Sequence, residues 1–163
     1  MIKIQISNPE LSFVKNKDDA SIEEALESIF LRNTEYAVLI WENLFIPLSY
    51  KYDISIMAKD FIKILEFIEG TDSKIEIHWA SNTFSSIWYL TKLQNGELEI
   101  KSLWVCVLGE LRELLTKKSN ICVTQIAFSK ELRKMLFFLK DCLDKCGYTA
   151  NELYDYNLLI KYI

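Results

Sequence analysis

The sequence predicts an α+β protein, a single domain with a predominantly antiparallel sheet and helices packed against it. Segments with a period of two residues, typical of strands, follow one another between residues 74 and 107, and segments of helical period flank them. Of the 163 residues, 50% are hydrophobic, and only 4 are glycine and 2 proline. The chain can therefore form a full core, and no stretch resembles a linker. We expect one domain spanning residues 1–163 and exclude collagen-like and disordered classes.

The chain is expected to open with a strand followed by a helix. Isoleucines alternate with polar residues over 2–7, the pattern of a half-buried strand. Ser21 and Glu24 have the spacing of a capping box, in which each side chain bonds the backbone of the other residue. Apolar residues follow at helical spacing over 22–30. This segment predicts an amphipathic helix with acidic residues on its outer side.

Two further strands and a second helix are expected next. Residues 36–41 (YAVLIW) are too few for a helix and suit a buried strand. The segment 44–50 continues as an edge strand, because Pro47 cannot donate a ladder hydrogen bond in the middle of a sheet. Asp53 stands where an N-cap belongs, ahead of an apolar stripe that stops at Gly70. This is the clearest helix pattern in the chain.

The middle of the chain predicts three antiparallel strands. Alternating patterns cover 74–80, 84–94 and 97–107. Asn95-Gly96 separates the last two, and this dipeptide is the strongest short signal for a hairpin, because both turn residues must accept positive φ. A fourth strand is expected within 120–128, whereas the periodicity of 108–118 does not separate helix from loop.

Two helices are expected at the end of the chain. Ser129 is the expected cap of a long helix that ends at Gly147. Thr149 and Glu152 have the spacing of a second capping box, ahead of a terminal helix over 153–160.

Charge and hydropathy exclude several classes of function. The formal net charge is −4 and the pI is about 5.1, which argues against a general nucleic-acid binder. No apolar stretch approaches the roughly 20 residues needed to span a bilayer, and residues 1–13 lack the features of a signal peptide. We therefore expect a cytoplasmic protein that does not bind membranes, with its four cysteines reduced.

The sequence contains little that indicates catalysis. His78 is the only histidine, and its strand pattern places it opposite Ile77 and Trp79, so we expect a surface histidine; a binding or acid-base role is the alternative. Phosphate-binding, nucleophile-elbow and zinc-protease motifs are all missing. We expect no catalytic residue, no metal and no cofactor. The cysteines stand in apolar runs and are expected to be buried, inert thiols: Cys106, Cys122, Cys142 and Cys146.

Acidic residues concentrate around the first predicted helix, where five carboxylates fall within ten residues: Asp18, Asp19, Glu23, Glu24 and Glu27. Residues 1–100 carry a formal charge of −7, whereas residues 101–163 carry +3. One interpretation is a solvated helix face whose acidic first turn suits the helix dipole. The other is a docking surface for a basic partner, because complementary charge speeds association.

Aromatic residues provide further candidates for binding. Trp41, Trp79 and Trp104 stand in apolar runs and are expected in the core. Trp88 lies in a segment whose two faces are both mixed, so it is a candidate contact residue if its face is exposed. The aromatic-rich tail over 154–162 is a candidate partner-binding edge.

The layout of residues 35–146 resembles small immunity proteins of bacterial contact-dependent growth inhibition and related polymorphic toxin systems. The resemblance rests on a strand ending in Trp41-Glu42, the turn 50–53 leading into the helix 57–70, a hairpin carrying Trp88 and Asn95-Gly96, then Leu103-Trp104 and the helix 131–143. It implies a cytoplasmic, non-enzymatic protein that binds one cognate toxin domain and covers its active site. If that toxin is a nuclease, its basic cleft would be attracted to the acidic residues around 18–27. A small enzyme using His78 or a carboxylate pair, and a homodimeric interaction module, remain alternatives; the oligomeric state is not predicted.

Overall fold

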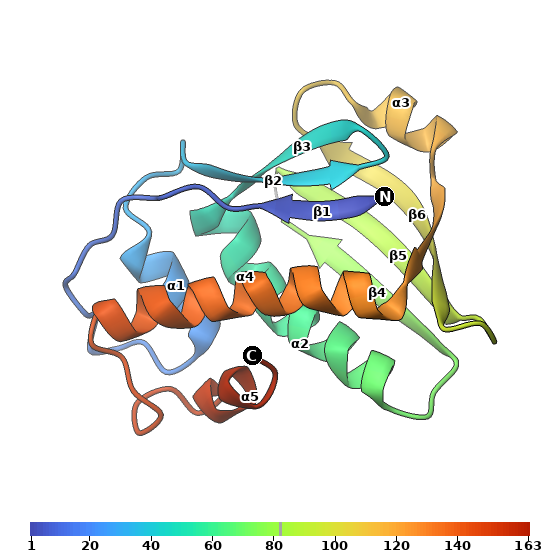
Figure 1. Cartoon of the computed structure of the whole chain (residues 1–163). Coiled ribbons are helices and arrows are strands. Elements are labelled where there is room, and N and C mark those ends of the chain that lie inside the picture. Colours follow the sequence, from blue (N-terminus) through green and yellow to red (C-terminus); the bar gives the residue numbers. More distant parts are fainter. Residues whose placement is uncertain (82) are drawn as a thin grey trace.

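The computed structural model describes residues 1–81 and 83–163, and their elements form two antiparallel sheets and five α-helices around one continuous core (Figure 1). The predicted α+β class is confirmed. In chain order the elements are β1 (Ile2–Gln5), α1 (Ile22–Ile29), β2 (Tyr36–Trp41), β3 (Leu44–Ser49), the π-helical turn η1 (Tyr50–Ile54), α2 (Ser55–Glu69), β4 (Lys74–Ala80), β5 (Phe84–Lys92), β6 (Glu97–Val107), α3 (Arg112–Lys117), β7 (Asn120–Thr124), α4 (Gln125–Lys145) and α5 (Tyr156–Lys161).

The first sheet has the order β1-β2-β3. Ile4 of β1 pairs with Leu39 of β2, which pairs with Ile46 of β3, and all three side chains are buried. Pro47 lies on the edge strand β3, as its missing N–H requires. The alternation predicted for the first strand is confirmed, because Ile2 and Ile4 of β1 are buried and Lys3 and Gln5 are exposed.

The second sheet has the order β4-β5-β6-β7. The predicted hairpin joins β5 and β6, but only Gly96 has the expected positive φ, at 77°. Asn95 does not, so the prediction that both residues of the pair have positive φ is wrong. The predicted fourth strand is present as β7, but it ends at Thr124. Its expected continuation, residues 125–128, is the first turn of α4 instead.

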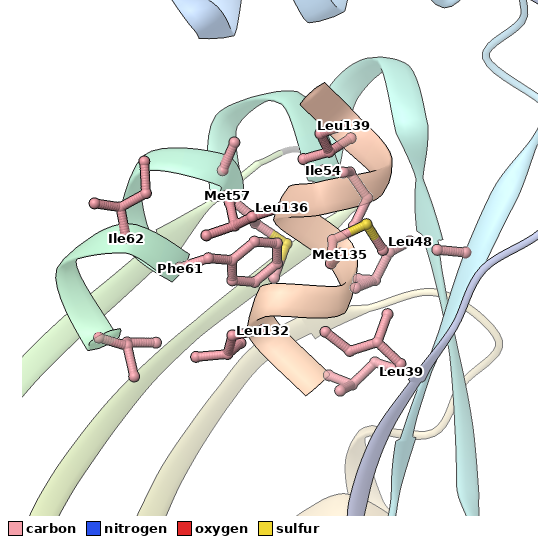
Figure 2. Packing of buried hydrophobic residues seen from close by; sticks show 14 of the residues in the cluster. Leu39, Leu48, Ile54, Met57, Phe61, Ile62, Leu132, Met135, Leu136 and Leu139 are labelled. Atoms are coloured by element: carbon pink, nitrogen blue, oxygen red, sulfur yellow. The ribbon is translucent and has the colours of Figure 1, made fainter. Parts of the chain in front are cut away.

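The helix α4 lies at the centre of the fold. Figure 2 shows Met57 and Phe61 of α2 on one side of α4, and Leu39 and Leu48 of the first sheet on the other. The inward side chains of α4 that meet them are almost fully buried, and each contributes about 1.5–3 kcal/mol by leaving water; they are Leu132, Met135, Leu136 and Leu139. The helix thus joins the two sheets into one core.

Three predicted helix boundaries are wrong. Thr124, not Ser129, caps α4, because β7 passes directly into the helix and Thr124 Oγ1 accepts a 3.2 Å hydrogen bond from the Ala127 N–H. Asp53 does not cap α2; it lies within η1 and turns into the core.

The third difference is at the end of the chain. Glu152 accepts hydrogen bonds from the Thr149 N–H and hydroxyl, but these bonds close a turn, and α5 begins only at Tyr156. The undecided segment 108–118 contains the short helix α3. Within the described residues, no helix is long and apolar enough to cross a membrane.

Candidate interaction surface

Two of the five predicted acidic residues serve the start of α1. The capping box is present: Ser21 accepts a hydrogen bond from the Glu24 N–H, and Glu24 accepts bonds from Ser21 N and, at 2.9 Å, from Ala20 N. The bond from Ala20 is the main cause that lowers the pKa of Glu24. Asp19 accepts hydrogen bonds from Ser28 and from the phenol of Tyr148. Both carboxylates are therefore committed to holding α1 in place.

Glu23 takes part in a charged cluster between α1, α2 and the C-terminal segment. Lys59 Nζ lies 3.5 Å from a Glu23 carboxylate oxygen, 3.6 Å from Asp155 Oδ2 and 3.4 Å from the phenol oxygen of Tyr154. Partial burial lowers the pKa of Lys59, but the Tyr154 phenol and the two carboxylates outweigh it and raise that pKa above its ordinary value. Lys59 thus neutralises part of the acidic charge, while Asp155 Oδ1 accepts a 2.8 Å bond from Ile22 N.

Asp18 and Glu27 have no such internal role. Both are exposed, and no hydrogen bond or ion pair joins either side chain to another residue within 1–81 and 83–163. A carboxylate that no internal partner neutralises keeps its charge available to a second molecule. These two residues are the part of the predicted cluster that a partner can use.

Exposed tyrosines border these carboxylates. Tyr52 lies in the turn η1, which follows β3, and is 41% exposed. It lines a hollow of about 350 Å³ together with Glu27 and Ile56. Tyr154 is 74% exposed and reaches Glu23 through Lys59. Tyrosine is enriched among residues that dominate binding energy at interfaces. We call Asp18, Glu23, Glu27, Tyr52 and Tyr154 the acidic surface.

Only one of these two tyrosines could be predicted from the sequence as a binding residue. Tyr154 lies in the aromatic tail that was a predicted binding edge, although Tyr156 and Tyr162 of the same tail are buried. Tyr52 was missed, because the π-helical turn buries Tyr50 and exposes Tyr52, and no simple period in the sequence separates them.

Trp88 is not a surface residue, so its predicted role as a partner contact is wrong. Its side chain is 2% exposed, and its ring centroid lies 5.2 Å from that of Trp41 and 5.1 Å from that of Trp79. The inward face of β5 packs against the first sheet, so the ring joins the core. Trp41, Trp79 and Trp104 are buried as predicted.

His78 lies on the outer face of β4, as predicted. It is exposed, and its Nε2 lies within hydrogen-bonding distance of the carboxylate of Glu76, two residues earlier on the same face.

The cysteines divide into two classes. Cys142 and Cys146 are buried in the stripe of α4, as predicted. Cys106 and Cys122 are exposed, and the prediction that they are buried is wrong. Cys122 alternates with the buried Ile121 on β7, which puts it on the outer face of the second sheet.

This division predicts a difference in reactivity. Burial raises the pKa of Cys142 to about 12, and the thiolate is the nucleophilic form. In the folded protein at pH 8, iodoacetamide is expected to alkylate Cys122 at least about 100-fold faster than Cys142, as measured by peptide mass spectrometry. In 8 M urea the two rates should converge. Equal rates in the folded protein would contradict the buried position of Cys142.

Among the described residues, no group of three or more His, Cys, Asp or Glu side chains is placed to hold a metal ion. Comparison with known proteins finds no family model, no curated protein and no solved structure that matches the chain.

Proposed function

We propose that this protein is a cytoplasmic immunity protein that binds a cognate bacterial toxin domain and blocks its active site. The observation that carries the proposal is the acidic surface. Asp18 and Glu27 are exposed and form no side-chain hydrogen bond or ion pair within 1–81 and 83–163. Tyr52 lines a hollow with Glu27, and Tyr154 is joined to Glu23 through Lys59. Carboxylates around exposed aromatic rings suit a basic protein surface. The substrate cleft of a nuclease is such a surface, because it must attract phosphate.

The charge of the acidic surface is expected to act mainly on the rate of association. Complementary charge steers two proteins together and can raise the association rate constant by orders of magnitude at low ionic strength. The effect weakens as salt screens exposed charges over about 8–10 Å. Tyr52 and Tyr154 would contribute mainly to slow dissociation, since apolar contact is not screened.

The first test is to identify the genes that flank this one and, where one encodes a large secreted toxin, to co-purify the C-terminal domain of that toxin with this protein. We expect a complex that survives gel filtration and in which the toxin is inactive. If the domain neither binds nor loses its toxicity, the proposal fails.

The second test changes charge without disturbing the fold. The double variant D18K/E27K is expected to lower the association rate constant about 10-fold or more at low salt, and to flatten its dependence on salt, in surface plasmon resonance. Glu24 is unsuitable for this test, because its carboxylate caps α1. The matched control is D72K/E113K, which changes the net charge equally at two exposed positions outside the acidic surface. Equal rate constants for the two double variants would show that the acidic surface is not the docking site.

A further inference from the structure

A second hollow, of about 670 Å³, lies at the N-terminal end of α4. It is a shallow hollow along the first turns of α4, and Ile68 at the end of α2 and Ile163 line its border. The helix α4 has 21 residues and is therefore about 31 Å long. Figure 1 shows α1 near the C-terminal end of α4, with the second sheet near its N-terminal end. This hollow is thus well separated from the acidic surface.

Two large apolar side chains of α4 that line the hollow are exposed to solvent. Ile126 is 84% exposed and Phe137 is 64% exposed, and both line it. They are 11 residues apart, which places them on the same face of the helix at a distance of about 16 Å along its axis. This face is separate from the inward face that forms the core.

Cations stand between the two apolar side chains. Lys130 and Arg133 share their face of α4, and Lys134 lies beside them. No Asp or Glu side chain is among the described residues that line the hollow, although the protein as a whole is acidic. Glu69 and Glu131 pair with Arg133 and Lys134 at the rim, so the positive charge of the hollow comes from Lys130 and is opposite in sign to that of the acidic surface.

The cations differ in how firmly they are held. Arg133 donates a 2.6 Å hydrogen bond to the carbonyl of Tyr162 and forms an ion pair with Glu69, so its guanidinium is fixed at the rim. Lys134 pairs with Glu131 at 2.5 Å. Lys130 is exposed and forms no ion pair within 1–81 and 83–163, so it supplies the net positive charge of the hollow.

We propose that this hollow binds an acidic amphipathic helix of a partner protein. Its apolar side chains would pack on Ile126 and Phe137, and its carboxylates would meet Lys130 and Arg133. Alternation of apolar and cationic side chains along one helix face is the pattern that complements such a segment. A nucleic-acid backbone would instead favour several cations free to bind phosphate, whereas two of the three cations here already pair with Glu69 and Glu131. This surface is independent of the proposed toxin contact, because the two surfaces differ in position and in the sign of their charge.

The probe is a fluorescein-labelled synthetic peptide of 14 residues with leucine at positions 1, 5, 8 and 12 and glutamate and alanine elsewhere. Its twin carries lysine in place of every glutamate. We expect the acidic peptide to bind with a Kd below about 100 μM in fluorescence anisotropy, and the basic twin to bind at least about 10-fold more weakly. Affinity for the acidic peptide should fall as salt increases.

Substitutions in the hollow test whether the acidic peptide binds there. K130E and F137A are each expected to weaken binding of the acidic peptide about 5-fold or more; both positions are exposed, so the fold should be unaffected. The matched controls are K145E, at the other end of α4, and L103A, an exposed leucine on β6, and neither should change the affinity.

The proposal is overturned if the two peptides bind equally, if neither binds at 1 mM, or if K130E and F137A behave like the controls. It is also overturned if sedimentation velocity shows self-association that K130E and F137A abolish, because a second copy of the chain would then fill the hollow. None of these outcomes affects the toxin experiment, whose variants lie on the acidic surface.

Discussion

Replacing Trp88 with alanine is expected to lower the free energy of unfolding by about 3–5 kcal/mol. The side chain is 2% exposed and contacts the rings of Trp41, Trp79 and Trp104, so truncation would leave a cavity where the two sheets meet. The surrounding rings are rigid and could close that cavity only in part. The measurement is urea unfolding followed by circular dichroism, with the midpoint and slope fitted together.

Two further variants of β5 serve as controls for the stability of W88A. W88F should cost much less than W88A, because it keeps most of the apolar area and because the Trp88 indole N–H has no acceptor among the described residues. Y89A, one residue along on the exposed face, should change stability by less than about 0.5 kcal/mol. If W88A proved stable and only toxin binding weakened, Trp88 would be a contact residue and its buried position would be wrong.

Trp88 also shows why part of this fold could not be predicted from sequence. The capping box at Ser21 and the Asn95-Gly96 hairpin are local signals, and both are present in the structure. The choice of inward face on β5 is not local, because each face of the strand carries both apolar and polar residues. It is decided by Trp41, which comes 47 residues earlier and reaches Trp88 from the other sheet.

The acidic stretch shows the same limit at a functional site. Asp18 and Asp19 are neighbours in sequence, yet only Asp19 is engaged, by Tyr148 from 129 residues away. The concentration of charge could be predicted, but the residues left available to a partner could not. The hollow on α4 depends equally on distant segments, since Ile68 and Ile163 line part of it.

Replacing Asp53 with alanine is expected to lower the free energy of unfolding by about 3–5 kcal/mol, because it removes a buried acceptor and leaves its donors unpaired. Asp53 is fully buried in η1. Its Oδ2 accepts a 2.7 Å bond from the Ser49 N–H, and its Oδ1 accepts bonds from the hydroxyls of Ser81 and, at 2.6 Å, Thr83. One carboxylate thus joins the end of the first sheet to the segment between β4 and β5.

The partners of Asp53 allow its anchoring role to be tested by urea unfolding and amide hydrogen exchange. D53N should cost less than D53A, because the amide keeps one acceptor oxygen. The double variant S81A/T83A removes two donors but leaves Ser49 N paired, so it should also cost less than D53A. Exchange at the Ser49 amide should accelerate in D53A and not in S81A/T83A. Equal exchange rates in both variants would mean that Asp53 does not hold this turn. Faster exchange in D53A alone would show that the carboxylate anchors η1. The same carboxylate would then position Tyr52 beside Glu27 on the acidic surface.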